Sequence, residues 1–307
     1  MRAAQMIAVA MAIATLCAGC RQPGFPADVA TTPLAVSSTP LIGVYEQGVP
    51  MHYGLITSFT AATGVRPRIV LYYSGWHEKF WTSFADTATA NGAVPFVEID
   101  PTGISLAAIA AGHYDRYLRT YAKAVRSFGR PVILGFGHEM NGNWYSWGAG
   151  HVMPSAFTAA WRHVVQVFRW AGAANVTWLW VVSSLNATDA PLRQWWPGAA
   201  WVNEVGIDGY YYRRSDTFAS VFGTTIASVR SFTTEPILIS ETAVAPAAGP
   251  GKIAGLFAGV RADHLLGLVW FDKAQHDPPV HLDWRLENNP PMLAAFRAAA
   301  RNSQDAG

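Results

Sequence analysis

The chain has little of what several large classes of protein require. Its only two cysteines, Cys17 and Cys20, lie near the N-terminus, so no disulfide can stabilise the rest of the 307 residues. Charged residues make up 14%, the net charge is +2, and Lys and Arg are scattered rather than clustered. Nucleic-acid binding needs a basic stripe, so we expect no nucleic-acid partner. Without disulfides, the stability of the fold must come from the apolar core.

Sequence motifs that would indicate other chemistries are also missing. No G-x-G-x-x-G follows the first apolar run, and there is no P-loop and no G-x-S-x-G nucleophile elbow. The stretch HDPPVH contains His276 and His281, but this spacing is not a known metal-ligand pattern. We therefore predict an activity that uses no metal and no cofactor.

The first 20 residues read as an export signal. Arg2 is followed by an apolar run over residues 6–16 and then by small residues. The ending LCAGC resembles a bacterial lipobox, which would make Cys20 a lipidated residue and anchor the protein to a membrane. The alternative is a plain secretory signal in which Cys20 occurs by chance. Residues 21–40, rich in Pro, Ser, Thr and Ala, are expected to be a flexible linker.

From residue 41 onward, short apolar runs alternate with helical patterns. The predicted helices include 113–129 and 154–172, each closed by a glycine as helix C-caps often are. The strand runs are apolar throughout, as in strands buried on both faces. Eight of them in about 260 residues favour a single (β/α)₈ TIM barrel over residues 41–301 rather than a doubly wound open sheet. The eight predicted strands are 41–45, 68–74, 93–99, 131–136, 176–182, 202–208, 236–241 and 265–271.

Polar and aromatic residues gather where these strands end. In a TIM barrel the working residues lie at the C-terminal ends of the strands, so Glu139 after the fourth strand and Glu241 at the seventh should share one cavity. The sequence also holds 13 tryptophans, and indole rings stack on sugar faces. Two carboxylates among aromatic rings suit the cleavage of a glycosidic bond.

The stretch HEMNGNWYSWG at 138–148 strongly resembles the strand-4 motif of glycoside hydrolase family 26. ILISET, GIDGYYY and WFDK with DWRLENNPPMLAAFR are similar to that family's later motifs, in the same order along the chain. The resemblance implies a retaining enzyme in which Glu139 is the general acid/base and Glu241 is the nucleophile. Such enzymes hold their two carboxyls about 5–5.5 Å apart.

The same resemblance implies a polysaccharide substrate and a set of residues that bind it. His138 would support the sugar or the nucleophile, Tyr210 would hydrogen-bond Glu241, and Asn141 would order the loop around Glu139. Trp144 and Trp270 would stack on sugar rings beside the cleaved bond. Two residues at other strand ends, Trp76 and Asp100, are further candidates for substrate binding.

One departure from the family bears on the substrate. Endo-mannanases of this family often carry a Trp-His-Pro motif after an early strand, where this chain reads VEIDPTG. We expect an endo-1,4-β-mannanase, with mixed-linkage β-glucan, β-1,3-xylan or an envelope polysaccharide as alternatives. A non-catalytic carbohydrate-binding lipoprotein is the alternative of another class. No helical seam suggests a partner protein, so a monomer is expected.

Overall fold

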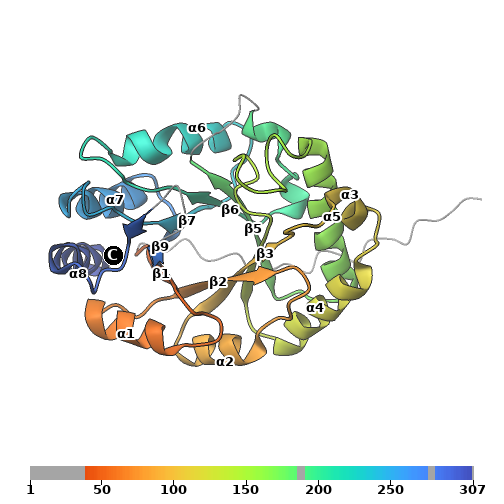
Figure 1. The fold of residues 1–307 in the computed structure, drawn as a ribbon, viewed down its shortest axis with the longest axis horizontal. Coiled ribbons are helices and arrows are strands. Elements are labelled where there is room, and N and C mark those ends of the chain that lie inside the picture. The colour runs from red at the N-terminus through yellow and green to blue at the C-terminus, as the bar shows by residue number, and fades with distance from the viewer. Residues whose placement is uncertain (1–38, 185–190, 276–280, 306–307) are drawn as a thin grey trace, which may run out of the picture. The chain divides into compact units, whose positions relative to one another are not determined.

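Eight parallel strands close into a barrel, as the sequence predicts. The computed structural model describes residues 39–184, 191–275 and 281–305 (Figure 1). Strand order is sequential from β1 to β8, and β8 pairs with β1 to close the ring. Cys17, Cys20 and most of the linker fall outside the described residues. The barrel strands are β1 (Leu41–Glu46), β2 (Ile69–Gly75), β3 (Val94–Asp100), β4 (Val132–Phe136), β5 (Val176–Ser183), β6 (Glu204–Asp208), β7 (Ile237–Thr242) and β8 (Gly267–Asp272).

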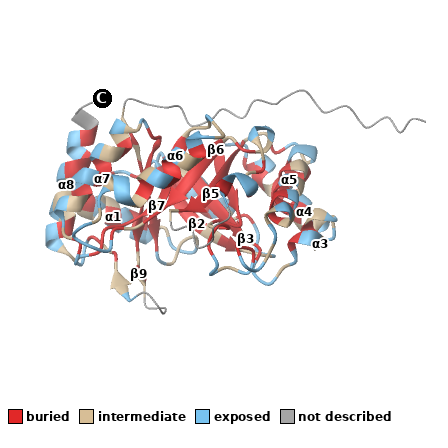
Figure 2. Ribbon diagram, turned by 90° about the horizontal axis from the view of Figure 1, so that it is seen from above, coloured by how far each residue is buried: buried red, intermediate tan, exposed pale blue. Residues whose placement is uncertain are grey.

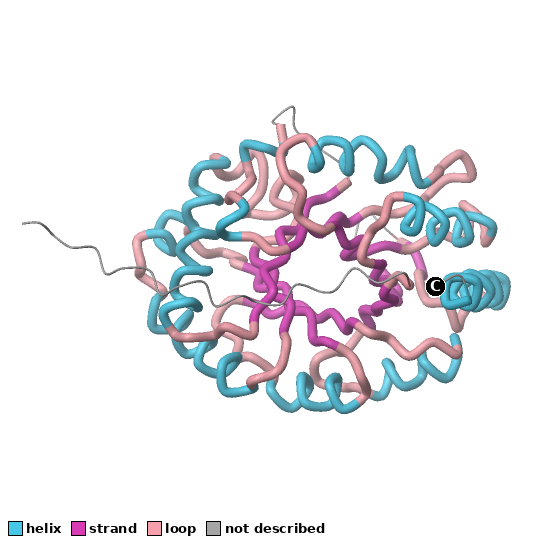
Figure 3. Tube along the Cα trace, turned by 180° about the vertical axis from the view of Figure 1, so that it is seen from behind, coloured by secondary structure: helices cyan, strands magenta, loops and turns pink. Residues whose placement is uncertain are grey.

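Helices surround the strands, and Figure 3 shows the inner ring of strands inside the outer ring of helices. Short elements fill the connections: η1 (Leu192–Gln194), η2 (Ala199–Trp201), η3 (Ala219–Gly223), β9 (Ala274–Gln275) and β10 (Leu282–Asp283). The helices are α1 (Gly54–Thr63), α2 (Thr82–Ala90), α3 (Leu106–Ala110), α4 (Asp115–Phe128), α5 (Pro154–Trp170), α6 (Thr224–Arg230), α7 (Gly251–Ala262) and α8 (Pro290–Asp305).

The two clearest helical patterns fold as predicted. Helix α4 ends at Gly129, whose φ of 70° lets its N–H reach the carbonyl of Val125. Helix α5 has Pro154 in its first turn, where the missing N–H costs no hydrogen bond. Among the described residues, no helix is long and apolar enough to cross a bilayer.

Burial runs through the strands and the inner faces of the helices (Figure 2). Successive strand residues point alternately into the barrel and outward to the helices. On β8, Phe271 stacks on Tyr45 at 4.9 Å between ring centroids, whereas Trp270 packs on Phe296 of α8 at 5.2 Å. Since Phe271 also meets Tyr210 at 5.9 Å, Phe271 faces the lumen and Trp270 faces the helical layer.

Candidate active site

Glu139 lies in a loop that the protein holds in an uncommon conformation. Its φ of 53° is in the left-handed region, which a residue with a side chain adopts only when its surroundings enforce it. The Glu139 N–H donates to the carbonyl of Val181 on β5 at 3.0 Å. Asn141 binds the backbone of Ser183 through both of its side-chain atoms, each at 2.8 Å. These contacts fasten the loop after β4 to the end of β5.

The Glu139 carboxyl is set up to keep its proton near neutral pH. The indole Nε1 of Trp144 donates to Glu139 Oε2 at 2.7 Å, and 44% of Trp144 remains exposed. Burial raises the pKa of Glu139 to about 7 and the charge of Glu241 adds to this, against the opposing effects of His138, Trp144 and Ser183. A carboxyl with such a pKa can donate a proton and later take one back.

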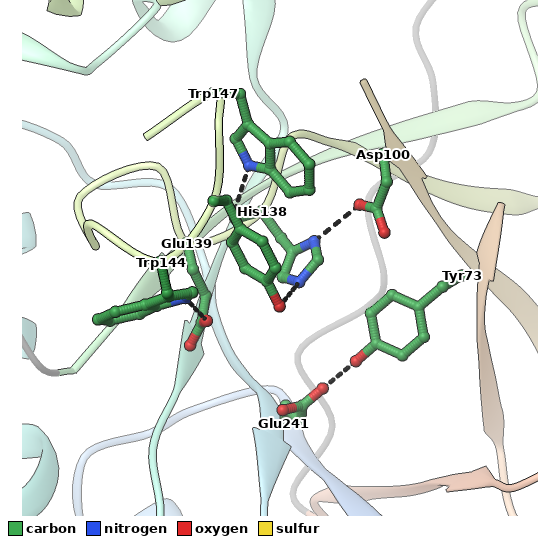
Figure 4. Close-up of polar contacts among 8 residues, drawn as sticks. Tyr73, Asp100, His138, Glu139, Trp144, Trp147 and Glu241 are labelled. Atoms are coloured by element: carbon green, nitrogen blue, oxygen red, sulfur yellow. Dashed lines mark hydrogen bonds and ion pairs between the residues drawn. The ribbon is translucent and has the colours of Figure 1, made fainter. Parts of the chain in front are cut away.

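Glu241, near the end of β7, is held by two phenol groups. Tyr73 on β2 donates to Glu241 Oε2, and Tyr210 after β6 donates to Oε1. Burial raises the pKa of Glu241, while these two hydrogen bonds favour the ionised form. Figure 4 shows Glu139 and Trp144 on one side of Glu241 and Tyr73 on the other. Each oxygen of Glu241 therefore has a fixed donor.

His138, the neighbour of Glu139 in the chain, has both ring nitrogens in use. Its Nδ1 is 3.0 Å from Asp100 Oδ1, and its Nε2 is 3.0 Å from the hydroxyl of Tyr145 (Figure 4). Burial opposes a charge on the imidazole, but Tyr145, Asp100 and Glu98 raise the pKa of His138 well above its usual value. The imidazole also packs against Tyr73 at 5.3 Å between ring centroids. His138 is thus oriented by the protein itself, and Asp100 is one of the residues that orient it.

Two further carboxyls are buried near this centre. Glu98 is 2% exposed and lies against Gly135, where an added Cβ would come within 2.4 Å of the carboxyl carbon. Asp208, at the end of β6, accepts a hydrogen bond from Ser240 Oγ at 2.6 Å. Burial raises the pKa of both carboxyls well above the usual values. A glycine at 135 is therefore required by the Glu98 side chain beside it.

A family model covers part of this site. The model of glycosyl hydrolase family 26 matches residues 106–244, from α3 to the end of β7, which include Glu139, Tyr210 and Glu241. This match places residues 106–244 in glycosyl hydrolase family 26.

Curated relatives and solved structures agree with the family. Endoglucanase H of Acetivibrio thermocellus is 29% identical over 262 residues, which are 80% of this chain and 28% of that protein. A mannan endo-1,4-beta-mannosidase of Bifidobacterium adolescentis is 28% identical over 123 residues, 36% of this chain and 12% of that protein. The chain thus spans well under half of the length of these relatives. In fold it is similar to a modular endo-beta-1,4-mannanase from Cellulomonas fimi, with a TM-score of 0.65, 20% identity, and coverage of 85% of this chain and 70% of that one.

Two aromatic residues expected to bind substrate lie elsewhere. Trp270 has no exposed surface and packs outward on α8, so a sugar cannot stack on it, and the expectation is wrong for this residue. Trp76 lies four residues after Tyr72, so it points to the same outer side of the barrel. Its ring packs against Tyr114 and Tyr117 at the start of α4. The structure therefore places Trp76 beside α4 and not among the residues around Glu139 and Glu241.

The site residues that were missed in the sequence include Tyr73 and Trp284, as well as Tyr145, which binds His138. Tyr73, which binds the nucleophile candidate, sits in the apolar run RIVLYYS, where neighbouring Tyr72 looks the same. Trp284 lies beyond β8, and its ring meets Tyr210 at 5.0 Å and Tyr212 at 5.7 Å. The only signal for Trp284 was its place in DWRLENN, a motif that the family resemblance includes.

The two phenols on Glu241 lead to a prediction. We expect Tyr73→Phe and Tyr210→Phe each to lower kcat/KM on the cleaved glycan by about 10- to 100-fold, since a hydrogen bond to a charged group contributes about 1.5–3 kcal/mol. Loss of a donor also raises the pKa of Glu241, so the acidic limb of the pH profile should move to higher pH. The matched control is Tyr211→Phe, whose buried hydroxyl has no partner among the described residues. Equal effects of all three variants would contradict a specific role for the two phenols.

Proposed function

We propose that the chain is a retaining endo-β-glycosidase with Glu139 as general acid/base and Glu241 as nucleophile. One observation carries this assignment: the two carboxyls have opposite surroundings. Glu241 receives a phenol donor on each oxygen, which suits an ionised nucleophile. Burial raises the pKa of Glu139 to about 7, which suits a proton donor. Retaining glycosidases need this division between their two carboxyls.

The proposed reaction has two displacements. In the first, Glu139 gives its proton to the glycosidic oxygen while Glu241 attacks the anomeric carbon, so the bond to the leaving sugar breaks and a glycosyl ester forms. In the second, Glu139, now ionised, takes a proton from water, and the water oxygen displaces Glu241. Trp144, which binds Glu139 through Nε1 and is 44% exposed, is the proposed stacking surface for the leaving sugar.

A β-glucan and β-1,4-mannan are the two substrates that we propose. The relative called Endoglucanase H matches 80% of this chain, which favours a β-glucan. The relative called mannan endo-1,4-beta-mannosidase matches only 36%, and the early Trp-His-Pro motif of mannanases is replaced here by VEIDPTG. Mannan, the expectation from the sequence motifs, therefore takes second place.

A panel of polysaccharides tests both the activity and the substrate. Reducing-sugar release would be measured on barley β-glucan, galactomannan, glucomannan, laminarin and β-1,3-xylan, using residues 39–307 and the Glu139→Ala, Glu241→Ala double variant. Release from β-glucan that the double variant abolishes would support the proposal. Binding of a glycan without release by the unaltered chain would contradict it and favour the carbohydrate-binding lipoprotein.

The pKa of Glu139 predicts the pH profile. Glu139 must be protonated for the first displacement, so we expect kcat/KM to fall above about pH 7, tenfold per pH unit. Removing the charge of Glu241 with Glu241→Gln lowers the pKa of Glu139, because the charge of Glu241 raises it. Direct titration of Glu139 by NMR in the two proteins checks this shift. An alkaline limb that begins above pH 9 would contradict the role of Glu139 as the acid.

We also propose that Cys20 is lipidated and that the protein is an exported, membrane-anchored monomer. The support is the LCAGC ending of the N-terminal apolar stretch. Metabolic labelling with a fatty acid in a bacterial host should label the full chain and not a Cys20→Ser variant. Labelling of both forms, or of neither, would contradict lipidation at Cys20.

A further inference from the structure

A second pair of carboxyls lies on the outer side of the barrel wall. Glu46 ends β1 and Asp272 ends β8, and the two are partners in the parallel strand register. Tyr45 and Phe271, one position earlier, stack inside the lumen, so Glu46 and Asp272 point outward, toward the helical layer. Both are buried, with 4% and 0% exposed. Neither can touch a substrate in the cleft.

Two carboxyls this close cannot both be ionised, so they retain a proton. Burial, followed by the charge of Asp272, raises the pKa of Glu46. Burial, followed by the charge of Glu287, raises the pKa of Asp272, while its hydrogen bond with Glu46 lowers it. The proton therefore belongs on Glu46, which donates to Asp272.

The remaining charged and titratable groups around the pair do not neutralise it. Arg285 precedes α8, but its guanidinium binds Asp283 through two contacts of 2.8 and 2.7 Å. Glu287, from the same segment, is exposed and negative, and Tyr45 on β1 has its pKa raised to about 12, so it stays neutral. Loss of the shared proton would leave two buried negative charges side by side.

The pair is connected to the catalytic centre through the segment 284–286. Asp272 Oδ1 accepts the N–H of Leu286 at 2.9 Å. Two residues earlier, the Trp284 ring packs on Tyr210 at 5.0 Å between centroids. Tyr210 in turn donates its hydrogen bond to Glu241. The order of contacts is Glu46, Asp272, segment 284–286, Tyr210 and Glu241.

We propose that Glu46 and Asp272 are positioning residues of the catalytic centre. By sharing a proton they fasten the segment 284–286 to the ends of β1 and β8, and this segment holds Tyr210 against Glu241. Release of the proton to solvent leaves two charges that repel, and the segment loosens. The role of Glu241 as nucleophile rests on the proposed function. The attachment of segment 284–286 to β1 and β8 does not depend on any glycan.

Urea unfolding between pH 6 and 8.5 tests the shared proton. Glu46→Gln keeps the shape and the donor to Asp272 but cannot lose a proton. The folded protein holds one proton more than the unfolded chain at this pair, so its stability falls as pH rises. The unfolding constant of the unaltered protein should therefore rise relative to that of Glu46→Gln by about tenfold per pH unit. Glu78→Gln, which removes an exposed carboxyl after β2, is the control and should follow the unaltered protein. Glu287→Gln removes a charge that raises the pKa of Asp272, so its unfolding constant should begin to deviate at a lower pH.

Hydrogen exchange of residues 282–289 tests the fastening, and kcat/KM on an aryl β-glycoside with a good leaving group tests its effect. Above the pH at which the proton is lost, the unaltered protein should lose at least about tenfold of its protection, corrected for intrinsic exchange, and Glu46→Gln should keep it. Over the same pH range, kcat/KM should fall in the unaltered protein and not in Glu46→Gln. If Glu46→Gln does not fold, Asp272→Asn serves, because its amide can accept from Leu286 and donate to ionised Glu46. Parallel unfolding slopes, or identical exchange in both proteins, would overturn the proposal. Absence of any glycosidase activity would instead overturn the proposed function and leave the unfolding and exchange results standing.

Discussion

Glu241→Ala is expected to lower kcat on the cleaved glycan at least about 10⁴-fold, because the covalent route is lost when the nucleophile is removed. We expect no other carboxylate to replace it, because Glu98 and Asp208 are buried and Ser240 already donates to Asp208. Steady-state rates on the best glycan of the panel, with circular dichroism to show that the variant folds, measure the effect. Glu235 lies just before the first residue of β7, whereas Glu241 lies near its last. Glu235→Ala is the matched control and should keep its activity.

A small anion separates a lost nucleophile from a damaged fold. Azide fits the space left by the Glu241 carboxyl and should attack the anomeric carbon of an aryl β-glycoside, giving the α-glycosyl azide. The β-glycosyl azide would contradict the assignment, because that product requires an intact nucleophile and a missing acid/base.

Glu139→Gln carries the second large effect, a fall in kcat/KM on the polysaccharide of about 10²–10⁴-fold. Glutamine keeps the acceptor for the indole N–H of Trp144, which donates to Glu139 at 2.7 Å, but it has no proton to give. The effect should depend on the leaving group, since a dinitrophenolate departs without protonation. The measurement is therefore kcat/KM for the polysaccharide and for a dinitrophenyl β-glycoside side by side.

The comparison between the two substrates identifies what Glu139 does. The dinitrophenyl glycoside should lose less than about tenfold in kcat/KM, because only general acid catalysis of the first step is removed. Equal losses on both substrates would assign Glu139 a role in holding the sugar instead. The substitution Asn141→Ala removes the hydrogen bonds between the Glu139 loop and Ser183. It should lower kcat/KM for both substrates by the same factor.

The barrel could be predicted from the sequence because its strands are short, apolar and evenly spaced. Every predicted strand overlaps an observed one, with bounds that differ by at most two residues. Helices α4 and α5 were predicted from their long periodic patterns. Helices α1 and α7 were not named, because GLITSFTAAT and GKIAGLFAGVRA contain Gly and Ala on several faces and give little amphipathic contrast.

The sequence does not tell which residues of a strand face the lumen and which face the helices. In a strand buried on both faces, apolar residues point inward and outward alike, so LVWF on β8 gives no sign that Trp270 faces α8 and Phe271 the lumen. The same ambiguity in LYYS hid Tyr73, which reaches Glu241, beside Tyr72, which packs on Phe84. Glu139 was found despite the ambiguity because it lies in HEMNGNWYSWG, the motif that carries the family resemblance.

The central claim is a double displacement at Glu139 and Glu241, and the stereochemistry of the first product tests it most directly. Proton NMR would follow the anomeric signals in the first minutes of hydrolysis of the glycan that the panel identifies. Two inversions at one carbon predict the β-anomer first, with the α-anomer appearing only as mutarotation proceeds. The α-anomer as first product would mean a single displacement by water and would contradict the account.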